Sequence, residues 1–422
     1  MELFLIKIAA FFRPIASLEY AETLFELVGG ALFLVLLGAL LMRMATSKAV
    51  YLSLIDLLIF AFVLWCLAIY VVYYDSARIK DVAKLLIPPL TYVVAKNVVQ
   101  TRCDYRALLL WMLAGFVLPI VLSVVLIATG EGVDYVSYWT DLPRWEGAYV
   151  GAHSMGHSMT LFLIALTVYW ATAGDGDRDG VFGTRSPVFV ALAAVMAGLS
   201  LYCLYMSQVR SAVLGLLVFA ATYLYFVRRA MLVYGAIATA IVAAGTVPYW
   251  LPALLPEVAM MQRGIELDVM DLGSDRPRYW LNDLTVFADL PLDRKLGGVG
   301  IGAIAEHSVG PRLYGHNDWL QILTQTGLVG LVLFFALQAA VLRRILRSHP
   351  EERALFLALF CAVNIMMLVS NSYVWRIQVS QLYYMILAFI EIRDPRRKSA
   401  EVPARQAAAV AVPAGRYRHL AE

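Results

Sequence analysis

The stretch LYGHNDWLQILTQTGLVGLVLFFALQAAVL, from Leu313 to Leu342, joins a polar segment directly to a long apolar run. The run from Asp318 to Leu342 exceeds the roughly 20 residues that a helix needs to cross the hydrocarbon of a bilayer. We expect this helix to be capped by Asn317 or Asp318, because either side chain can accept from the first free backbone N–H groups. The stretch therefore predicts a transmembrane helix with polar residues at its entrance.

The composition extends this prediction to the whole chain. Hydrophobic residues make up 61% of the 422 residues and charged residues 15%, against roughly 45–50% and 25% in soluble domains. We predict an all-α, polytopic integral membrane protein with eleven or twelve transmembrane helices, because only helices and closed barrels satisfy their backbone in lipid. Met1–Ala21 either adds the twelfth span or lies as an amphipathic helix in the membrane interface. The eleven predicted spans are Phe25–Met42, Leu54–Tyr74, Val82–Val99, Ala107–Ala128, Ser154–Ala173, Val188–Tyr205, Ala212–Val227, Met231–Trp250, Asp318–Leu342, Ala354–Val369 and Ile377–Ile390.

The distribution of Lys and Arg predicts the orientation. Basic clusters such as RRILR at Arg343 and RDPRRK at Arg393 fall on one side when the spans alternate, and that side is expected to be the cytoplasm. We predict an N-terminal transmembrane bundle (1–250), a large periplasmic loop (251–316), C-terminal transmembrane helices (317–393) and a disordered cytoplasmic tail (394–422). This organisation predicts a multi-pass protein of the bacterial inner membrane with its unusual polar sequence facing the periplasm. The net charge of +3 is explained by cytoplasmic anchoring and gives no support for nucleic-acid binding.

Arg210 stands out because it lies at the outward start of a predicted span, far in sequence from any Asp or Glu. A charge at membrane depth costs about 3 kcal/mol unless it finds an anionic partner or water. Two interpretations follow, a fixed phosphate ligand or an arginine whose long side chain reaches the lipid headgroups.

A second arginine site lies in the large loop, in LGSDRPRYWLNDLTVFADLPL. This segment predicts a short helix with Pro277 in its first turn, so Arg276 or Arg278 would stand at a helix N-terminus, which favours bound phosphate. Alternatively, the two arginines pair with acids such as Asp283. The glycine run GGVGIG (297–302) that follows could approach a ligand closely.

His316 directly precedes the capped start of the long helix. The positive end of that helix should disfavour the imidazolium form and leave a neutral imidazole that can accept a proton. A neutral imidazole at this position could act as a general base. The alternative is a histidine that merely bonds a neighbouring carbonyl.

Further polar residues flank the outward ends of other spans. RWEGAYVGAHSMGHSM places Arg144, Tyr149 and His153 there, and Lys84 lies at the outward end of the third span. We count them as candidate substrate-binding residues, although Lys84 could equally anchor the span to headgroups. His153 and His157 share a helix face, but no Asp, Glu or Cys nearby completes a metal-ligand set, so we predict no metal.

Three segments, SQVRSAVLGL, SDRPRYW and GHNDWLQILTQTGLVGLVLF, in this order and spacing, resemble the O-antigen ligase and polymerase superfamily of bacterial membrane glycosyltransferases. The resemblance implies a polytopic, GT-C-like fold and an inverting reaction without metal or cofactor. It implies His316 as the essential loop histidine, Arg210 as the membrane-edge arginine, and Arg276, four residues before Trp280, as the loop arginine. Arg278 is the alternative for the last role, and we count it with Trp280, Asn317 and Asp318 among the substrate-binding residues.

The resemblance also implies the substrates. The donor would be a glycan linked through diphosphate to undecaprenol. The leading hypothesis is a ligase that moves this glycan onto the lipid A core, and the runner-up is a polymerase that uses a second lipid-linked glycan as acceptor. A single dominant outward loop favours the ligase. A transporter of the same lipid is the competing class, but its charges would be spread along the spans rather than gathered on one face.

Overall fold

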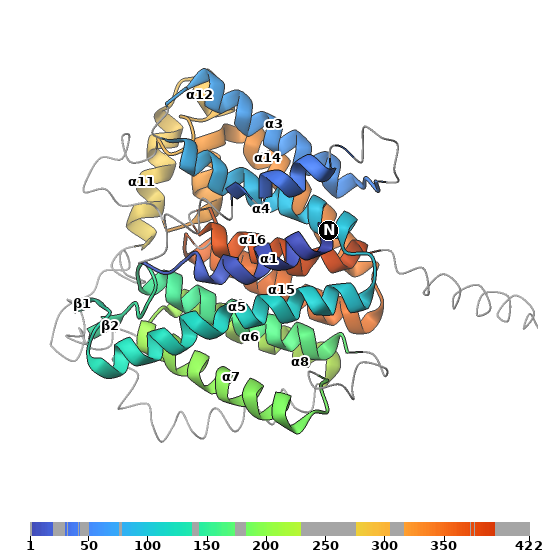
Figure 1. Cartoon of the computed structure of the whole chain (residues 1–422). Coiled ribbons are helices and arrows are strands. Elements are labelled where there is room, and N and C mark those ends of the chain that lie inside the picture. Colours follow the sequence, from blue (N-terminus) through green and yellow to red (C-terminus); the bar gives the residue numbers. More distant parts are fainter. Residues whose placement is uncertain are drawn as a thin grey trace, which may run out of the picture.

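The computed structural model describes residues 2–19, 30–31, 33–40, 42, 50–75, 78–136, 143–173, 183–228, 276–303, 316–371, 373–374 and 376–392. These residues are almost entirely helical, as predicted, and the long helices run side by side in one bundle (Figure 1). The elements are α1 (Glu2–Ile15), α3 (Leu54–Val72), α4 (Ile79–Val98), α5 (Arg102–Thr129), β1 (Val133–Val136), β2 (Pro143–Trp145), α6 (Ala152–Ala171), α7 (Pro187–Ser207), α8 (Arg210–Val227), α11 (Arg276–Asp289), α12 (Leu292–Gly297), α14 (Asp318–Leu346), α15 (Pro350–Val369), α16 (Ile377–Leu387) and the 3₁₀ helix η4 (Ala388–Glu391).

Within the described ranges, six helices are long and apolar enough to cross a membrane, namely α3, α5, α7, α8, α14 and α15. The protein is therefore a multi-pass membrane protein. The helices α4, α6 and α16 coincide with predicted spans but are not among those six. The short length of α16 is one reason. The predicted span Met231–Trp250 and the predicted tail lie outside the described residues, and Phe25–Met42 is described only in part. The count of eleven or twelve spans stays a prediction.

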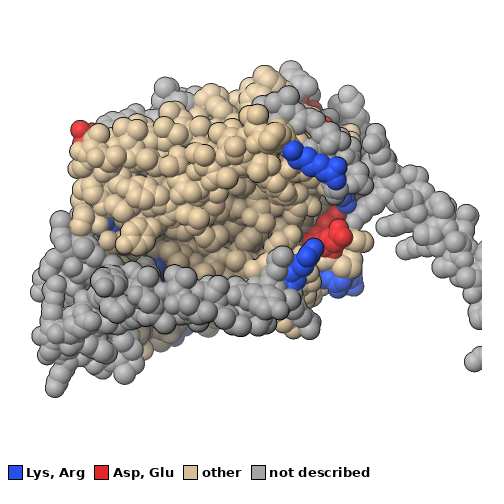
Figure 2. Space-filling model, turned by 90° about the horizontal axis from the view of Figure 1, so that it is seen from below, with Lys and Arg blue, Asp and Glu red and all other residues tan. Residues whose placement is uncertain are grey.

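The surface of the bundle supports this assignment. Figure 2 shows a broad face of the described residues that is almost free of charged side chains, with Lys, Arg, Asp and Glu gathered mainly at one end. Large apolar side chains point outward along the spans, for example Val71 and Val188, which are 73% and 71% exposed. Such a contiguous apolar surface is expected where lipid, rather than water, surrounds a protein.

The first helix packs against the bundle, and whether Met1–Ala21 is a twelfth span or an interfacial helix stays a prediction. Helix α1 packs lengthwise against α5 inside the bundle (Figure 1), and Ile6 and Ala10 are completely buried. The two backbones approach so closely that a side chain at Gly115 of α5 would overlap the carbonyl of Phe11. The apolar face of α1 is therefore covered by α5.

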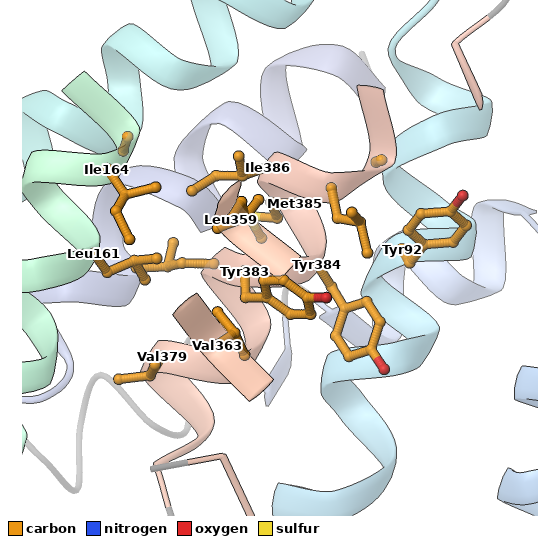
Figure 3. Close-up of a cluster of buried hydrophobic side chains, with 14 of the residues drawn as sticks. Tyr92, Leu161, Ile164, Leu359, Val363, Val379, Tyr383, Tyr384, Met385 and Ile386 are labelled. Atoms are coloured by element: carbon orange, nitrogen blue, oxygen red, sulfur yellow. The ribbon is translucent and has the colours of Figure 1, made fainter. Parts of the chain in front are cut away.

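Helix α16 is the central element of the core. Figure 3 shows Tyr383 and Met385 of α16 between side chains of the neighbouring helices α4, α6 and α15, among them Tyr92, Leu161 and Leu359. Every residue of α16 except Gln378 is buried. A helix that is buried all round cannot shift without opening the core, so the residues that enter it from the preceding loop are held in place.

A buried ion cluster fixes the far end of the same segment. Nζ of Lys96 on α4 lies 2.9 Å from Oε2 of Glu391 on η4, and it also bonds Asp56 on α3. Ser53 caps α3 and donates from its hydroxyl to Glu391. Buried charges are tolerated only when they are paired in this way. The cluster therefore ties η4, and with it α16, to α3 and α4.

Helix α14 is broken at Gly327, whose φ of 69° and ψ of −174° are not helical. A break inside an apolar span frees carbonyl groups, which must find other donors. Nε1 of Trp65 on α3 donates to the carbonyl of Thr326 at 2.8 Å. The break is thus satisfied by groups from outside α14.

The glycine run after α12 supplies the remaining donors. The N–H groups of Val299 and Gly300 donate to the carbonyls of Thr324 and Gln325 at 2.9 and 3.3 Å. A side chain at Gly298 would overlap the carbonyl of Gln325, which explains the need for glycine. The sequence suggested that this run approaches a ligand, whereas the structure shows that it approaches the backbone of α14.

Candidate functional site

The site is built around the start of α14. Asn317 is the N-cap, as one of the two predicted alternatives, because its Oδ1 accepts from the N–H groups of Trp319 and Leu320 at 3.0 and 3.2 Å. Asp318 is fully buried. Its carboxylate accepts from the backbone N–H groups of Tyr373 and Val374 at 2.7 and 3.0 Å. The two residues after the histidine therefore organise the backbone around it.

The loop held by Asp318 joins α15 to α16. Its Tyr373 hydroxyl donates to the Tyr384 hydroxyl of α16 at 2.6 Å, which gives the loop a second anchor. Asn371 and Arg376 lie on this loop, and Nη1 of Arg376 donates to both Oδ1 of Asn371, at 3.2 Å, and the Asn371 carbonyl. The loop is thus a fixed platform that presents one amide and one guanidinium group.

His316 lies directly before α14 in an unusual backbone conformation. Its φ of +43° is left-handed, which costs an L-residue about 1–2 kcal/mol and is common at functional sites. Its ring stacks near that of His153, with centroids 6.0 Å apart, and His153 stacks in turn near His157 at 5.9 Å. Helix α6 therefore brings two histidines to the predicted loop histidine.

Arginines from separate elements surround these rings. Arg276 opens α11 as predicted, and its Nη1 donates to the carbonyl of Val369 at the end of α15. Nε of Arg144 on β2 donates to the Ser207 carbonyl at the end of α7 at 3.1 Å. Each guanidinium is thereby fixed at a helix end, close enough for its charge to act on His316.

These charges set the protonation state of His316. Burial lowers the pKa of His316 from 6.5 to about 4, and the positive charges of Arg276, Arg376 and Arg144 contribute, while a hydrogen bond with Asn371 opposes them. The direction agrees with the predicted neutral imidazole, and burial and the arginine charges act in this direction. Burial and the charges of Arg376 and Arg144 also lower the pKa of His153. Nδ1 of His316 has no hydrogen-bond partner among the described residues.

Arg210 lies at the start of α8, next to a residue that contacts this cluster. The chain between α7 and α8 is only Gln208 and Val209, the short turn that the sequence predicted, and Arg210 is the first residue of α8. The next residue, Ser211, has its hydroxyl 3.1 Å from Nε2 of His157. The start of α8 therefore contacts the histidines of α6 through Ser211, the residue after Arg210.

The other predicted residues are Lys84, Arg278, Tyr149 and Trp280. Lys84 pairs with Asp81 at 3.5 Å on α4, beside the glycine run at Gly302. Arg278 is exposed on α11. Tyr149 is completely buried in the core. Trp280 is half-buried on α11. Substrate-binding roles for these four residues stay predictions.

The described ranges contain no group of three or more His, Cys, Asp and Glu side chains that could hold a metal ion. Asp318 belongs to the same region, but both of its oxygens accept backbone N–H groups. The polar groups that the described residues place around His316 include imidazole, amide and guanidinium groups.

Two residues of the site, Asn371 and Arg376, do not figure in the sequence-based prediction. Both lie in NSYVWRIQVSQ, between two predicted spans. The sequence does mark Arg376 as a candidate, because it directly precedes an apolar run on the predicted outward side, as Arg210 does. Its closeness to His316, 60 positions earlier in the chain, depends on the contact between Asp318 and the loop and is not visible in the sequence.

The fold and the site define a class, a multi-pass helical membrane protein with a neutral histidine among arginines at one end of its bundle. Residues 192–335 match the family model described as O-antigen ligase, so this segment is similar to that family. The segment runs from α7 into α14 and contains Arg210, Arg276 and His316. The family supports a function of the O-antigen ligase or polymerase type, acting on lipid-linked glycans. No individual curated protein matches the chain.

Proposed function

We propose that the protein is an O-antigen ligase, an inverting glycosyltransferase that moves a glycan from undecaprenyl diphosphate to a sugar of the lipid A core. It would reside in the inner membrane with this site facing the periplasm. The observation that carries the proposal is the position of neutral His316 beside Arg276 and Arg144, within or next to the segment that matches the O-antigen ligase model. A base and fixed cations at one place are what this transfer needs.

The reaction assigns a role to each group. A hydroxyl oxygen of the acceptor attacks the anomeric carbon of the donor, and its proton passes to a ring nitrogen of His316, the general base. The bond from the anomeric carbon to the diphosphate oxygen breaks, and undecaprenyl diphosphate leaves with the electron pair. Attack from the opposite side inverts the anomeric configuration. Arg276 and Arg210 would stabilise the charge that develops on the leaving diphosphate.

Arginines can supply this stabilisation without a divalent cation. The charges of three guanidinium groups act on His316, and guanidinium binds phosphate oxygens in a bidentate manner. The nearby carboxylate of Asp318 is already engaged by two N–H groups. We therefore propose a reaction that proceeds in the presence of a chelator, with no metal and no cofactor.

Unpaired polar groups on α11 and α14 are suited to sugar hydroxyls. Nε1 of Trp280 and Oδ2 of Asp283 are buried without a hydrogen-bond partner in the described part of the chain, as are both amide atoms of Gln321. Burial raises the pKa of Asp283 to about 6. Buried polar groups are normally hydrogen-bonded, so a bound glycan would satisfy them. The apolar spans would accommodate the prenyl chain among the membrane lipids.

The decisive assay combines purified protein, lipid-linked glycan and lipid A core, with and without EDTA. We expect glycan to be transferred to the lipid A core and undecaprenyl diphosphate to be released. The rate of transfer should be the same with and without EDTA. Elongated lipid-linked glycan in the absence of core would instead identify a polymerase. Movement of the lipid across a vesicle membrane without any glycosidic product would identify a transporter.

The pH dependence follows from the neutral state of His316. A general base works in its unprotonated form, and the pKa of His316 in the free protein is about 4. We expect kcat/KM for transfer to stay level from pH 8 down to about pH 5 and to fall only below that. An unperturbed imidazole would lose half its activity near pH 6.5. A fall centred at or above pH 6.5 would contradict the assignment of His316 as the base.

A further inference from the structure

Arg376 belongs to a loop that is fixed on both sides. Asp318 holds the backbone N–H groups of Tyr373 and Val374, and the Tyr373 hydroxyl donates to Tyr384. After Arg376 the chain enters the buried helix α16. The backbone of Arg376 is therefore placed by the core and by the start of α14, the same element that places His316.

The guanidinium group of Arg376 is oriented but not saturated. Its Nη1 donates to Oδ1 and to the carbonyl of Asn371, whereas its Nε is buried and has no hydrogen-bond partner among the described residues. A guanidinium carries five N–H donors in a rigid fork. The buried Nε of Arg376 thus requires an acceptor that the described part of the protein does not provide.

The charges around Arg376 favour an anion as that acceptor. The positive charge of Arg376 acts on His316 and His153, so the group lies beside the histidine cluster. Burial and the charge of Arg144 lower the pKa of Arg376 to about 10, against the effect of Asp318, and Arg376 remains charged at neutral pH. Asp318 shares its carboxylate with two N–H groups. A buried cationic surplus of this kind is costly until an anion offsets it.

We propose that Arg376 is a further ligand of the donor diphosphate, and that Asn371 holds its guanidinium for this contact. The inference rests on the proposed function and adds a residue from outside the matched segment 192–335. Arg376 would bind the diphosphate oxygens in the ground state and take up part of their charge as the glycosidic bond breaks. It would lie on the side of the diphosphate that faces His316.

Binding of undecaprenyl diphosphate to purified protein in nanodiscs tests this role. Arg376→Gln should weaken binding about 10- to 100-fold, because a charge-assisted bidentate contact is lost. Arg376→Lys should recover part of the affinity, because it restores the charge without the fork. Arg343→Gln is the matched control, since Arg343 is an exposed arginine in the last turn of α14, and it should bind as the wild type does. Arg376→Gln should weaken the binding of undecaprenyl monophosphate less than it weakens the binding of undecaprenyl diphosphate.

A second readout separates a direct role from a structural one. The charge of Arg376 lowers the pKa of His316. In Arg376→Gln the fall of kcat/KM at acidic pH should therefore begin at a higher pH, whereas in Arg343→Gln the pH profile should not change. A folded Arg376→Gln variant with wild-type affinity and an unshifted pH profile would overturn the inference. If that variant does not fold, Arg376→Lys decides, and wild-type affinity there would refute a bidentate contact. Wild-type protein that neither binds undecaprenyl diphosphate nor transfers glycan would instead refute the proposed function.

Discussion

Replacing His316 with alanine is expected to lower kcat for glycan transfer by a factor of about 10² to 10⁴, the usual contribution of a positioned general base. The reason is that the acceptor hydroxyl would have to lose its proton to water. Affinity for undecaprenyl diphosphate should change little, because His316 is neutral at pH 7 and provides no charge for the diphosphate. The measurement is a single-turnover rate with purified protein, lipid-linked glycan and lipid A core.

His349 supplies the control for this experiment. It is an exposed histidine between α14 and α15, at the opposite end of α14 from His316. His349→Ala should therefore transfer glycan at the wild-type rate. An undiminished rate in His316→Ala would remove the general base from the mechanism and leave only the arginines as the proposed catalytic groups.

Asp318→Ala is expected to destabilise the protein as well as to inactivate it. The substitution leaves the buried N–H groups of Tyr373 and Val374 without an acceptor, at about 1–3 kcal/mol for each group. The loop with Asn371 and Arg376 would lose an anchor, so transfer should fall along with the thermal midpoint. Asp318→Asn should give an intermediate result, because one amide oxygen remains to accept.

The comparison variant for Asp318 is Asp289→Ala, which removes an exposed carboxylate at the end of α11. Its thermal midpoint and activity should match those of the wild type. A substrate-binding role for Asp318, which the family resemblance implies, makes a different prediction. A higher KM for the lipid-linked donor in Asp318→Ala, with an unchanged thermal midpoint, would support direct substrate binding over the anchoring role.

The helices of the bundle follow from local sequence. Apolar runs of sufficient length can satisfy their backbone in lipid only as helices, so the bounds of α3, α5 and α14 could be predicted within a few residues. The start of α11 could also be predicted from local sequence, because a proline lies in its first turn. The packing of α1 inside the bundle did not follow, because its amphipathic pattern fits a protein groove and a membrane surface equally well.

The candidate site, like the fold, could be predicted from the sequence only in part. The sequence by itself determined that His316, Arg276 and Arg210 stand next to helix starts, because a cap, a proline or a short turn before an apolar run marks such positions locally. Only the tertiary structure decided which groups meet. The buried carboxylate of Asp318 and the core around α16 bring Arg376 to His316. The glycine run donates backbone N–H groups to carbonyls at the break in α14. Contacts between distant segments depend on how helix faces fit together, and that information is shared among all the helices rather than carried by any one stretch.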